Sequence, residues 1–385
     1  MKITKNINFK NLLITLTPTI VVLFLFSLGF VSCYFVIDRV FENQIQKDAK
    51  AHTLGRLLKE GKERDEVARV YHDSARALNL LDDISWAVPN IPTPFVGTAP
   101  TPGQNGVAHI NKLQFRAREE LTSPKPGKTY RIFITGGSTA YGSGAPSDET
   151  TIAGYLNTLL EKQLTPTTKI KYEVLTMANP AWASTQERIV IENLLSELEP
   201  DMVISFSGVN DVHWGMRGRN ILWFRSYSDE FFLSLIKKIY WLTGQPDIPE
   251  NTEMSPNGVS PAMVAERLLK NTRISAFVLS EKNADYVFVL QPTLATTSKK
   301  LTERESAKLK VPVQSYFKDC YVLLVKGLGG MQGRNFQFID LSGVFDSLRE
   351  NEDIFIDSYH FGDRGNQKIA ENLFLKIKGR ISGGE

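Results

Sequence analysis

Cysteine is scarce in this 385-residue chain, which contains two, Cys33 and Cys320. Cys33 lies inside an apolar segment near the N-terminus, so we expect no structural disulfide between the two. The sequence also lacks a CxxC pair, a cluster of Cys and His, and an HExxH motif among its five histidines. Without these ligand spacings the sequence predicts no metal site.

An excess of positive charge is also missing. The chain has 45 Lys and Arg against 42 Asp and Glu, which leaves a formal net charge of +3. No basic run is interleaved with aromatic residues. The sequence therefore does not favour a nucleic-acid partner.

Residues 11–37 carry no charge. A bilayer core of about 30 Å takes roughly 20 apolar helical residues, so this stretch is long enough to span a membrane. A signal peptide cleaved near residues 27–29 is the alternative, but the apolar run continues past that point and favours an uncleaved signal anchor. The basic, acid-free tail over 1–10 predicts a single-pass protein with its N-terminus inside and its main domain outside the cytoplasm, periplasmic or extracellular.

Two segments separate this anchor from the main domain. Residues 38–85 are polar, with apolar residues at helical spacings, which predicts a helical stalk. Residues 86–128 are predicted to be a Pro-rich linker and lead-in segment, because five prolines and two glycines fall within 88–104.

From residue 129 to 385 short apolar runs alternate with amphipathic stretches. The expected strands are 130–135, 171–177, 202–207, 285–291 and 336–340. The expected helices are 150–163, 185–198, 262–283, 304–327 and 363–378. This alternation predicts a three-layer α/β/α domain with a flavodoxin-like, five-stranded parallel sheet in the order 2-1-3-4-5. Ligands of such sheets bind at the carboxyl ends of the strands.

The first strand ends in Gly136-Gly137-Ser138-Thr139. One interpretation is a turn with a capping serine. A phosphate cradle is another, but no GK[ST] follows these glycines and the chain has no GxGxxG, so we expect no cofactor. The third is a nucleophilic serine. Asn210 follows the third strand and Asp357-x-x-His360 follows the fifth, so the groups that acyl transfer through a serine needs would meet at one edge of the sheet.

Four motifs at strand ends resemble those of the SGNH (GDSL-like) hydrolase superfamily of esterases, lipases and carbohydrate-ester deacetylases. They are Gly-Gly-Ser-Thr at 136–139, Asn-Pro-Ala-Trp-Ala-Ser-Thr-Gln at 179–186, Gly-Val-Asn-Asp at 208–211 and Asp-Ser-Tyr-His at 357–360. The resemblance covers about two thirds of the chain, residues 129–380. It implies a catalytic triad of Ser138, His360 and Asp357.

The same resemblance implies an oxyanion hole and its supports. The hole would consist of the Ser138 amide, the amide at Ala181 and the Asn210 side chain. The supporting residues would be Gly137, Gly208 and Asp211, with Asp211 bracing the turn of its own motif. Ala181 departs from the pattern, because the family has a glycine there. Alanine aims its amide easily only if its φ is negative, because a positive φ is much easier for glycine.

The chemistry follows from the residue types. A serine hydroxyl is a poor nucleophile at neutral pH and needs an adjacent base, which we expect to be His360. Asp357 would bond the other ring nitrogen, fix the tautomer and stabilise the imidazolium.

Residues 212–260 form an insertion crowded with aromatic residues and arginines, which either packs on the domain or caps the site. His213 is expected to line the site at most.

We therefore expect a membrane-anchored, extracytoplasmic serine esterase acting on an O-acyl ester, such as an acetyl group on a cell-envelope polysaccharide. An O-acyltransferase would use the same residues. A non-catalytic glycan-binding or scaffold module is the rival from another class. A soluble cytoplasmic lipase is disfavoured by the N-terminal segment. The sequence predicts no particular oligomeric state.

Overall fold

The computed structural model describes residues 17–36, 39, 53–58, 61–87, 89–218, 236–245, 259–309 and 311–382. The chain divides into two compact units, Met1–Ala49 and Lys50–Glu385. The predicted basic tail over 1–10 lies outside the described residues.

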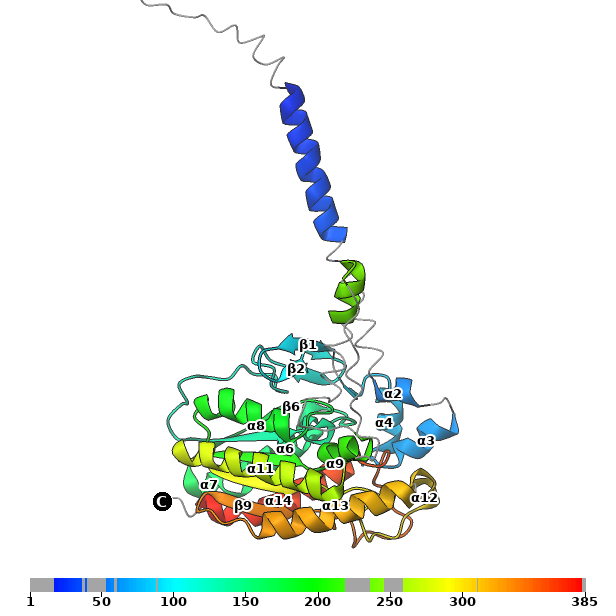
Figure 1. Cartoon of the computed structure of the whole chain (residues 1–385), viewed down its shortest axis with the longest axis vertical. Coiled ribbons are helices and arrows are strands. Elements are labelled where there is room, and N and C mark those ends of the chain that lie inside the picture. Colours follow the sequence, from blue (N-terminus) through cyan, green and yellow to red (C-terminus); the bar gives the residue numbers. More distant parts are fainter. Residues whose placement is uncertain are drawn as a thin grey trace, which may run out of the picture. The chain divides into compact units, whose positions relative to one another are not determined.

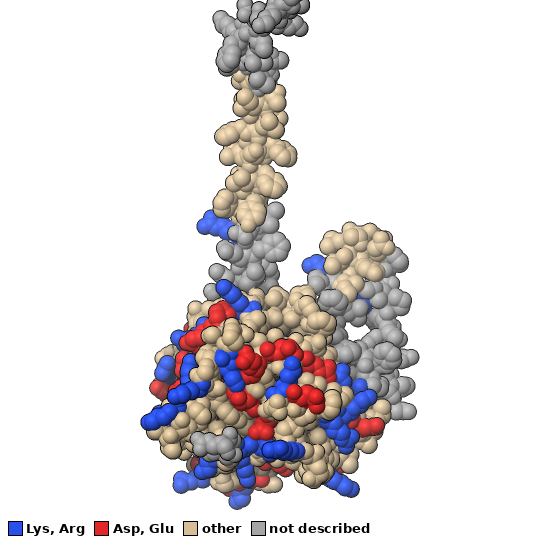
Figure 2. Space-filling view, turned by 90° about the vertical axis from the view of Figure 1, so that its left-hand side faces the viewer, with Lys and Arg blue, Asp and Glu red and all other residues tan. Residues whose placement is uncertain are grey.

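The N-terminal unit contains one helix, Thr17–Val36, among its described residues. Its 20 residues include no charged side chain, and Figure 2 shows it without blue or red atoms, whereas both signs of charge are interspersed over the larger unit. At about 1.5 Å per residue the helix is about 30 Å long, the thickness of a bilayer core. Its length and composition suit a membrane anchor or a signal sequence.

The larger unit is built on five parallel strands in the order β6-β5-β7-β8-β9. Their bounds are Thr129–Gly136 for β5, Lys171–Ala178 for β6, Met202–Ser207 for β7, Asp285–Leu290 for β8 and Phe336–Asp340 for β9. Counted along the chain, this order is 2-1-3-4-5. The predicted fold class and strand order are confirmed, and each predicted strand overlaps an observed one.

Helices cover both faces of this sheet, because its strands are apolar on both sides. Ile132 and Ile134 of β5 pack into one core with α6 and α14, while Phe133 between them packs into a second core with α8, α11 and α13. Figure 1 shows α8, α11 and α13 side by side. The bounds are Ile152–Gln163 for α6, Ser184–Asn193 for α8, Pro261–Glu281 for α11, Val311–Gly329 for α13 and Asp363–Ser382 for α14.

One predicted helix is wrong in its continuity. The sequence favours a single helix over 304–327, but the chain forms α12, Glu303–Lys308, and then α13. The first helix ends because the backbone of Leu309 is extended, with a φ of −88° and a ψ of 122°. The remaining short elements are α5 Ser138–Tyr141, α7 Thr165–Thr168, α9 Val209–Met216, η1 Asp148–Thr150 and η2 Leu195–Glu197.

The structure corrects the predicted stalk, 38–85, in the part that it describes from residue 53 on. Residues 53–85 form α2 Leu54–Leu57, α3 Lys62–Ala68 and α4 Ser74–Leu80, which lie together at one edge of the larger unit (Figure 1). Their apolar residues form a third core with Ile356 of the domain: Leu54, Val67, Val70, Tyr71, Ala77, Leu81 and Ile84. The apolar spacing was read correctly as helical, but the apolar face is buried against the domain.

The segment predicted to be a Pro-rich linker, 86–128, also folds onto the domain. It forms two antiparallel hairpins, β1 Asn90–Thr93 with β2 Gly97–Pro100 and β3 Gly103–Asn105 with β4 Ala108–Ile110. The Thr98 carbonyl accepts a 3.0 Å hydrogen bond from Trp182 Nε1, and the Arg116 amide donates to the Thr176 carbonyl of β6 at 2.9 Å.

The predicted insertion over 212–260 is described in part. Residues 212–218 continue α9 and its end, and 236–245 begin as a helix. Residues 219–235 and 246–258 lie outside the described residues, so a cap over the site stays a prediction.

The docking of residues 53–85 predicts a difference between Leu78 of α4 and Leu81, which directly follows that helix. Leu81 is fully buried and Leu78 is 38% exposed. We expect Leu81→Ala to lower the free energy of unfolding of residues 50–385 by about 2–5 kcal/mol, because it leaves a cavity in the third core. Leu78→Ala is the matched control and should change it by less than about 1 kcal/mol. If residues 53–85 were a stalk without contacts to the domain, neither substitution would change the free energy of unfolding measured with denaturant.

Candidate active site

The end of β5 approaches its neighbours so closely that only glycine fits. A Cβ on Gly136 would overlap the Phe206 carbonyl of β7, and Gly136 also has a φ of 150°. A Cβ on Gly137 would overlap the Asn210 amide group. The glycine pair therefore lets the chain turn from β5 into α5 with Ser138 as the first helical residue.

Ser138, His360 and Asp357 form a continuous chain of hydrogen bonds. His360 Nε2 lies 2.6 Å from Ser138 Oγ, although the two residues are 222 positions apart in the chain. His360 Nδ1 lies 2.8 Å from Asp357 Oδ2 and 2.9 Å from Oδ1. His360 is buried, with an exposed fraction of 8%. The structure thus brings together the three residues that the sequence assigns to catalysis.

The Asp357 carboxylate is held in its ionised form. Burial alone raises its pKa, but His360 and the amides of Tyr359 and His360, which donate to Oδ1 at 2.8 and 2.9 Å, outweigh that effect and hold the pKa below its usual 3.8. A carboxylate beside Nδ1 keeps the ring hydrogen on that atom, which leaves Nε2 free to accept the Ser138 proton. The same carboxylate stabilises the imidazolium that forms after the transfer.

The loop that carries Asp357 is fixed from behind by α12. Glu305 is fully buried and accepts hydrogen bonds from the amides of Ile354 and Phe355 at 3.0 and 3.2 Å. Arg304 donates to the carbonyls of Phe355 and Ile356. Lys299 pairs with Glu305 at 2.7 Å and both side chains are fully buried. These bonds, with the bridge between Phe355 and Phe361, satisfy the backbone of a loop that lies outside the strands of the sheet.

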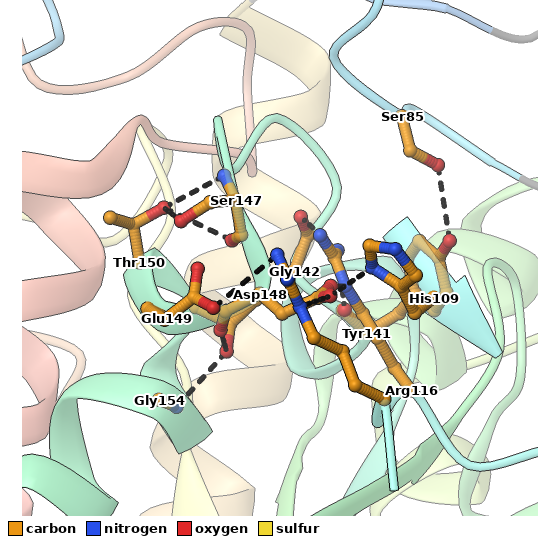
Figure 3. Close-up of polar contacts among 12 residues, drawn as sticks. Ser85, His109, Arg116, Tyr141, Gly142, Ser147, Asp148, Glu149, Thr150 and Gly154 are labelled. Atoms are coloured by element: carbon orange, nitrogen blue, oxygen red, sulfur yellow. Dashed lines mark hydrogen bonds and ion pairs between the residues drawn. The ribbon is translucent and has the colours of Figure 1, made fainter. Parts of the chain in front are cut away.

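The turn that carries Ser138 is held in the same way by Arg116 (Figure 3). Arg116 is 5% exposed and donates to the carbonyls of Tyr141 and Gly142, at the C-terminal end of α5, at 3.0 and 2.9 Å. Asp148 binds the Arg116 Nε at 2.9 Å and His109 Nδ1 at 2.7 Å. A buried guanidinium thus receives a charged partner and satisfies carbonyls that a four-residue helix leaves free.

Ala181 does not meet the condition for an easily aimed amide. Its φ is 71°, in the left-handed region, whereas alanine aims its amide easily only at negative φ. The conformation costs an L-residue about 1–2 kcal/mol. The turn is held against this strain by Trp214 Nε1, which donates to the Ala181 carbonyl at 3.4 Å, and by Asn210 Nδ2, which donates to the Trp182 carbonyl at 2.7 Å. The role of the Ala181 amide as an oxyanion donor stays a prediction.

The Gly-Val-Asn-Asp motif positions two side chains. Gly208 has a φ of 110° and caps the start of α9, which places Asn210 against Gly137 beside the Ser138 turn. Asp211 is fully buried and accepts from the amide of Ser184 at 2.9 Å and from its hydroxyl at 2.6 Å. Asp211 therefore braces the start of α8, the helix of the neighbouring motif, and not the turn of its own motif alone.

Glu187 is a buried carboxyl that the sequence analysis missed. It lies on α8, is 2% exposed and bonds to the Ser207 hydroxyl directly before Gly208. Burial raises its pKa to about 7 from an ordinary 4.5, and the nearby Asp211 adds to the rise while the serine hydroxyls oppose it.

This raised pKa predicts a loss of stability as the pH rises. Below pH 4.5 Glu187 is protonated in both states, whereas between pH 4.5 and 7 only the unfolded state ionises freely. The penalty grows to about 3 kcal/mol above pH 7. Glu187→Gln lacks it, so denaturant unfolding should show the variant gaining on the wild type by up to that amount between pH 5 and pH 8. Glu192→Gln on the same helix is the control; parallel pH curves for Glu187→Gln and wild type would contradict the assignment.

His213 lies beside the loop that carries Asp357 and His360, here called the base loop. Its Nδ1 is 3.0 Å from the Tyr359 hydroxyl, and Tyr359 stacks on Phe317 with ring centroids 5.6 Å apart. Burial, with help from Arg217, lowers the pKa of His213 to about 4, so the ring is neutral at pH 7. His213 therefore contributes a neutral polar group next to Asp357 and His360.

Trp86 contacts the triad, and the sequence analysis did not assign it a role. Its ring lies 4.3 Å from the His360 ring between centroids, tilted by 55°. The Ser143 hydroxyl donates to the Trp86 carbonyl, and Ser85 Oγ is 3.0 Å from the Tyr141 hydroxyl (Figure 3). A single tryptophan between a polar helical stretch and a Pro-rich stretch was the one available signal.

Within the described ranges no group of three or more His, Cys, Asp or Glu side chains could hold a metal ion. No family model matches the chain, and no curated protein matches it by sequence.

Solved structures with a similar chain path have low scores. An acetyl xylan esterase is 17% identical with a TM-score of 0.38, and covers 64% of this chain and 99% of its own. A lipase from a goat rumen metagenome is 14% identical with a TM-score of 0.41, with 64% and 96% covered. An acetylxylan esterase from Geobacillus stearothermophilus is 12% identical with a TM-score of 0.41, with 64% and 94% covered. We base the function proposed below on the geometry of the site and not on these likenesses.

Proposed function

We propose that the protein is a serine ester hydrolase of SGNH type. The observation that carries the proposal is the hydrogen-bonded chain Ser138–His360–Asp357, with 2.6 Å between Oγ and Nε2. A serine, a histidine and a carboxylate in this order are the arrangement that activates a hydroxyl for attack on a carbonyl.

The reaction proceeds in two halves. Ser138 Oγ attacks the ester carbonyl while His360 Nε2 takes its proton, and Asp357 stabilises the imidazolium. The imidazolium then gives that proton to the alcohol oxygen as the carbon–oxygen bond breaks, which leaves an acyl group on Ser138. Water, deprotonated by the same nitrogen, releases the acid and restores the serine. Asn210 and the Ser138 amide are proposed to stabilise the oxyanion of both steps.

The substrate is proposed to be an O-acyl ester, such as an acetyl ester, on a carbohydrate of the cell envelope. The helix Thr17–Val36 supports this location, since a chain anchored by it would hold its larger unit at the membrane surface. The larger unit is proposed to lie outside the cytoplasm.

The proposal predicts ester turnover that depends on one hydroxyl. Residues 50–385 should hydrolyse p-nitrophenyl acetate, and faster than longer-chain esters. Ser138→Ala should lower kcat by roughly 10⁴-fold or more, since the residues of a triad act as one unit. Ser342→Ala, after the edge strand β9, is the matched control and should keep wild-type rates. Equal turnover in the wild type and Ser138→Ala, measured by p-nitrophenol release, would contradict the proposal.

A further inference from the structure

Trp86 is in ring contact with the residue that protonates the alcohol part of the ester in the proposed reaction. The alcohol oxygen receives its proton from His360 Nε2, so it must come within about 3 Å of that atom. The indole ring is 4.3 Å from the imidazole ring between centroids. The indole is therefore an aromatic surface beside the base, within reach of a leaving group that is larger than a few atoms.

The Trp86 ring is held in place before substrate arrives. Trp86 packs against the third core on one side, while its carbonyl accepts from the Ser143 hydroxyl of the turn after α5. Beside it, the Ser85 carbonyl accepts from the Gly144 amide at 3.1 Å, and the Tyr71 hydroxyl donates to the Gly144 carbonyl at 2.8 Å. An aromatic platform fixed from behind loses little entropy when a ligand stacks on it.

Trp86 is half-buried and offers an apolar surface beside His360. Tyr359, the residue before His360, carries a hydroxyl that is bonded at 3.0 Å to the neutral His213 ring of α9. An aromatic surface and polar groups on either side of the base suit a ring with hydroxyl groups better than a hydrocarbon chain. Sites that combine one aromatic platform with a few placed polar groups fix the orientation of a polar ligand, whereas a subsite for a long acyl chain is lined by apolar groups throughout.

We propose that Trp86 is a specificity-determining residue that binds the alcohol part of the substrate, and that this part is a pyranose ring stacked on the indole. The proposal deepens the proposed function and rests on it for the direction in which the alcohol leaves. Trp86 is the first residue of the segment predicted to be a Pro-rich linker, so a residue outside the predicted hydrolase domain would select the substrate.

Kinetics with a constant acyl group tests the role in specificity. The full chain in detergent is assayed with two acetyl esters, ethyl acetate and methyl 6-O-acetyl-glucopyranoside, by release of acetate. Trp86→Ala should lower kcat/KM for the sugar ester by roughly 10- to 100-fold and for ethyl acetate by less than about threefold. Trp86→Phe should keep most of the sugar activity. A loss of equal size for both esters would overturn the proposal, because it would mean that Trp86 only positions His360.

Binding separates this proposal from the proposed function. Ser138→Ala cannot turn over the sugar ester, so calorimetry can measure its Kd for methyl 6-O-acetyl-glucopyranoside directly. Adding Trp86→Ala to Ser138→Ala should raise that Kd about tenfold or more. Trp86-dependent binding in a chain without esterase activity would support the sugar subsite while the proposed function failed. Absent binding, or binding that is unchanged by Trp86→Ala, would overturn the subsite.

Discussion

The close approach of β5 to β7 is the constraint on which the site depends. Gly136 and Gly137 let the chain pass the Phe206 carbonyl and the Asn210 amide group with no room for a Cβ. The turn that results exposes Ser138 at the carboxyl edge of the sheet, where the loop after β9 delivers His360 at 2.6 Å. A larger residue at either glycine would move the nucleophile away from its base, and the effect of about 1 Å on such a geometry is large.

Both halves of the triad lie outside the strands of the sheet, Ser138 at the start of a short helix and His360 on a loop, and charged side chains hold both segments. Arg116 and Asp148 fix the C-terminal end of the short helix that starts with Ser138, while Glu305 and Lys299 fix the backbone before Asp357. The segment 53–87 contacts the turn after α5 and the start of α14, since Tyr71 bonds to Gly144 and the His72 amide donates to Asp363 at 3.0 Å. The N-terminal segment is therefore part of the scaffold of the site.

The sequence was sufficient for the sheet and for the residues that follow each strand, because strand periodicity and short motifs are local signals. It was insufficient for residues 53–128. There the apolar helical spacing and the prolines indicate the type of local structure, but they do not indicate which part of the chain packs against it. Arg116 and Trp86 gain their roles through contacts with Tyr141 and His360, which lie 25 to 274 positions away in the chain. The φ of Ala181 was also beyond sequence reasoning, since surrounding hydrogen bonds impose it against the preference of alanine.

The most direct test of the account is covalent labelling of the nucleophile. The native protein is treated with a serine-directed fluorophosphonate, and the modified peptide is identified by mass spectrometry in the wild type and in His360→Ala. The account predicts one adduct, on Ser138, that forms roughly 10³-fold or more slowly without His360, because an unassisted serine hydroxyl is a poor nucleophile. No adduct on Ser138, or an adduct that forms at the same rate in His360→Ala, would show that the serine is not activated and would contradict the account.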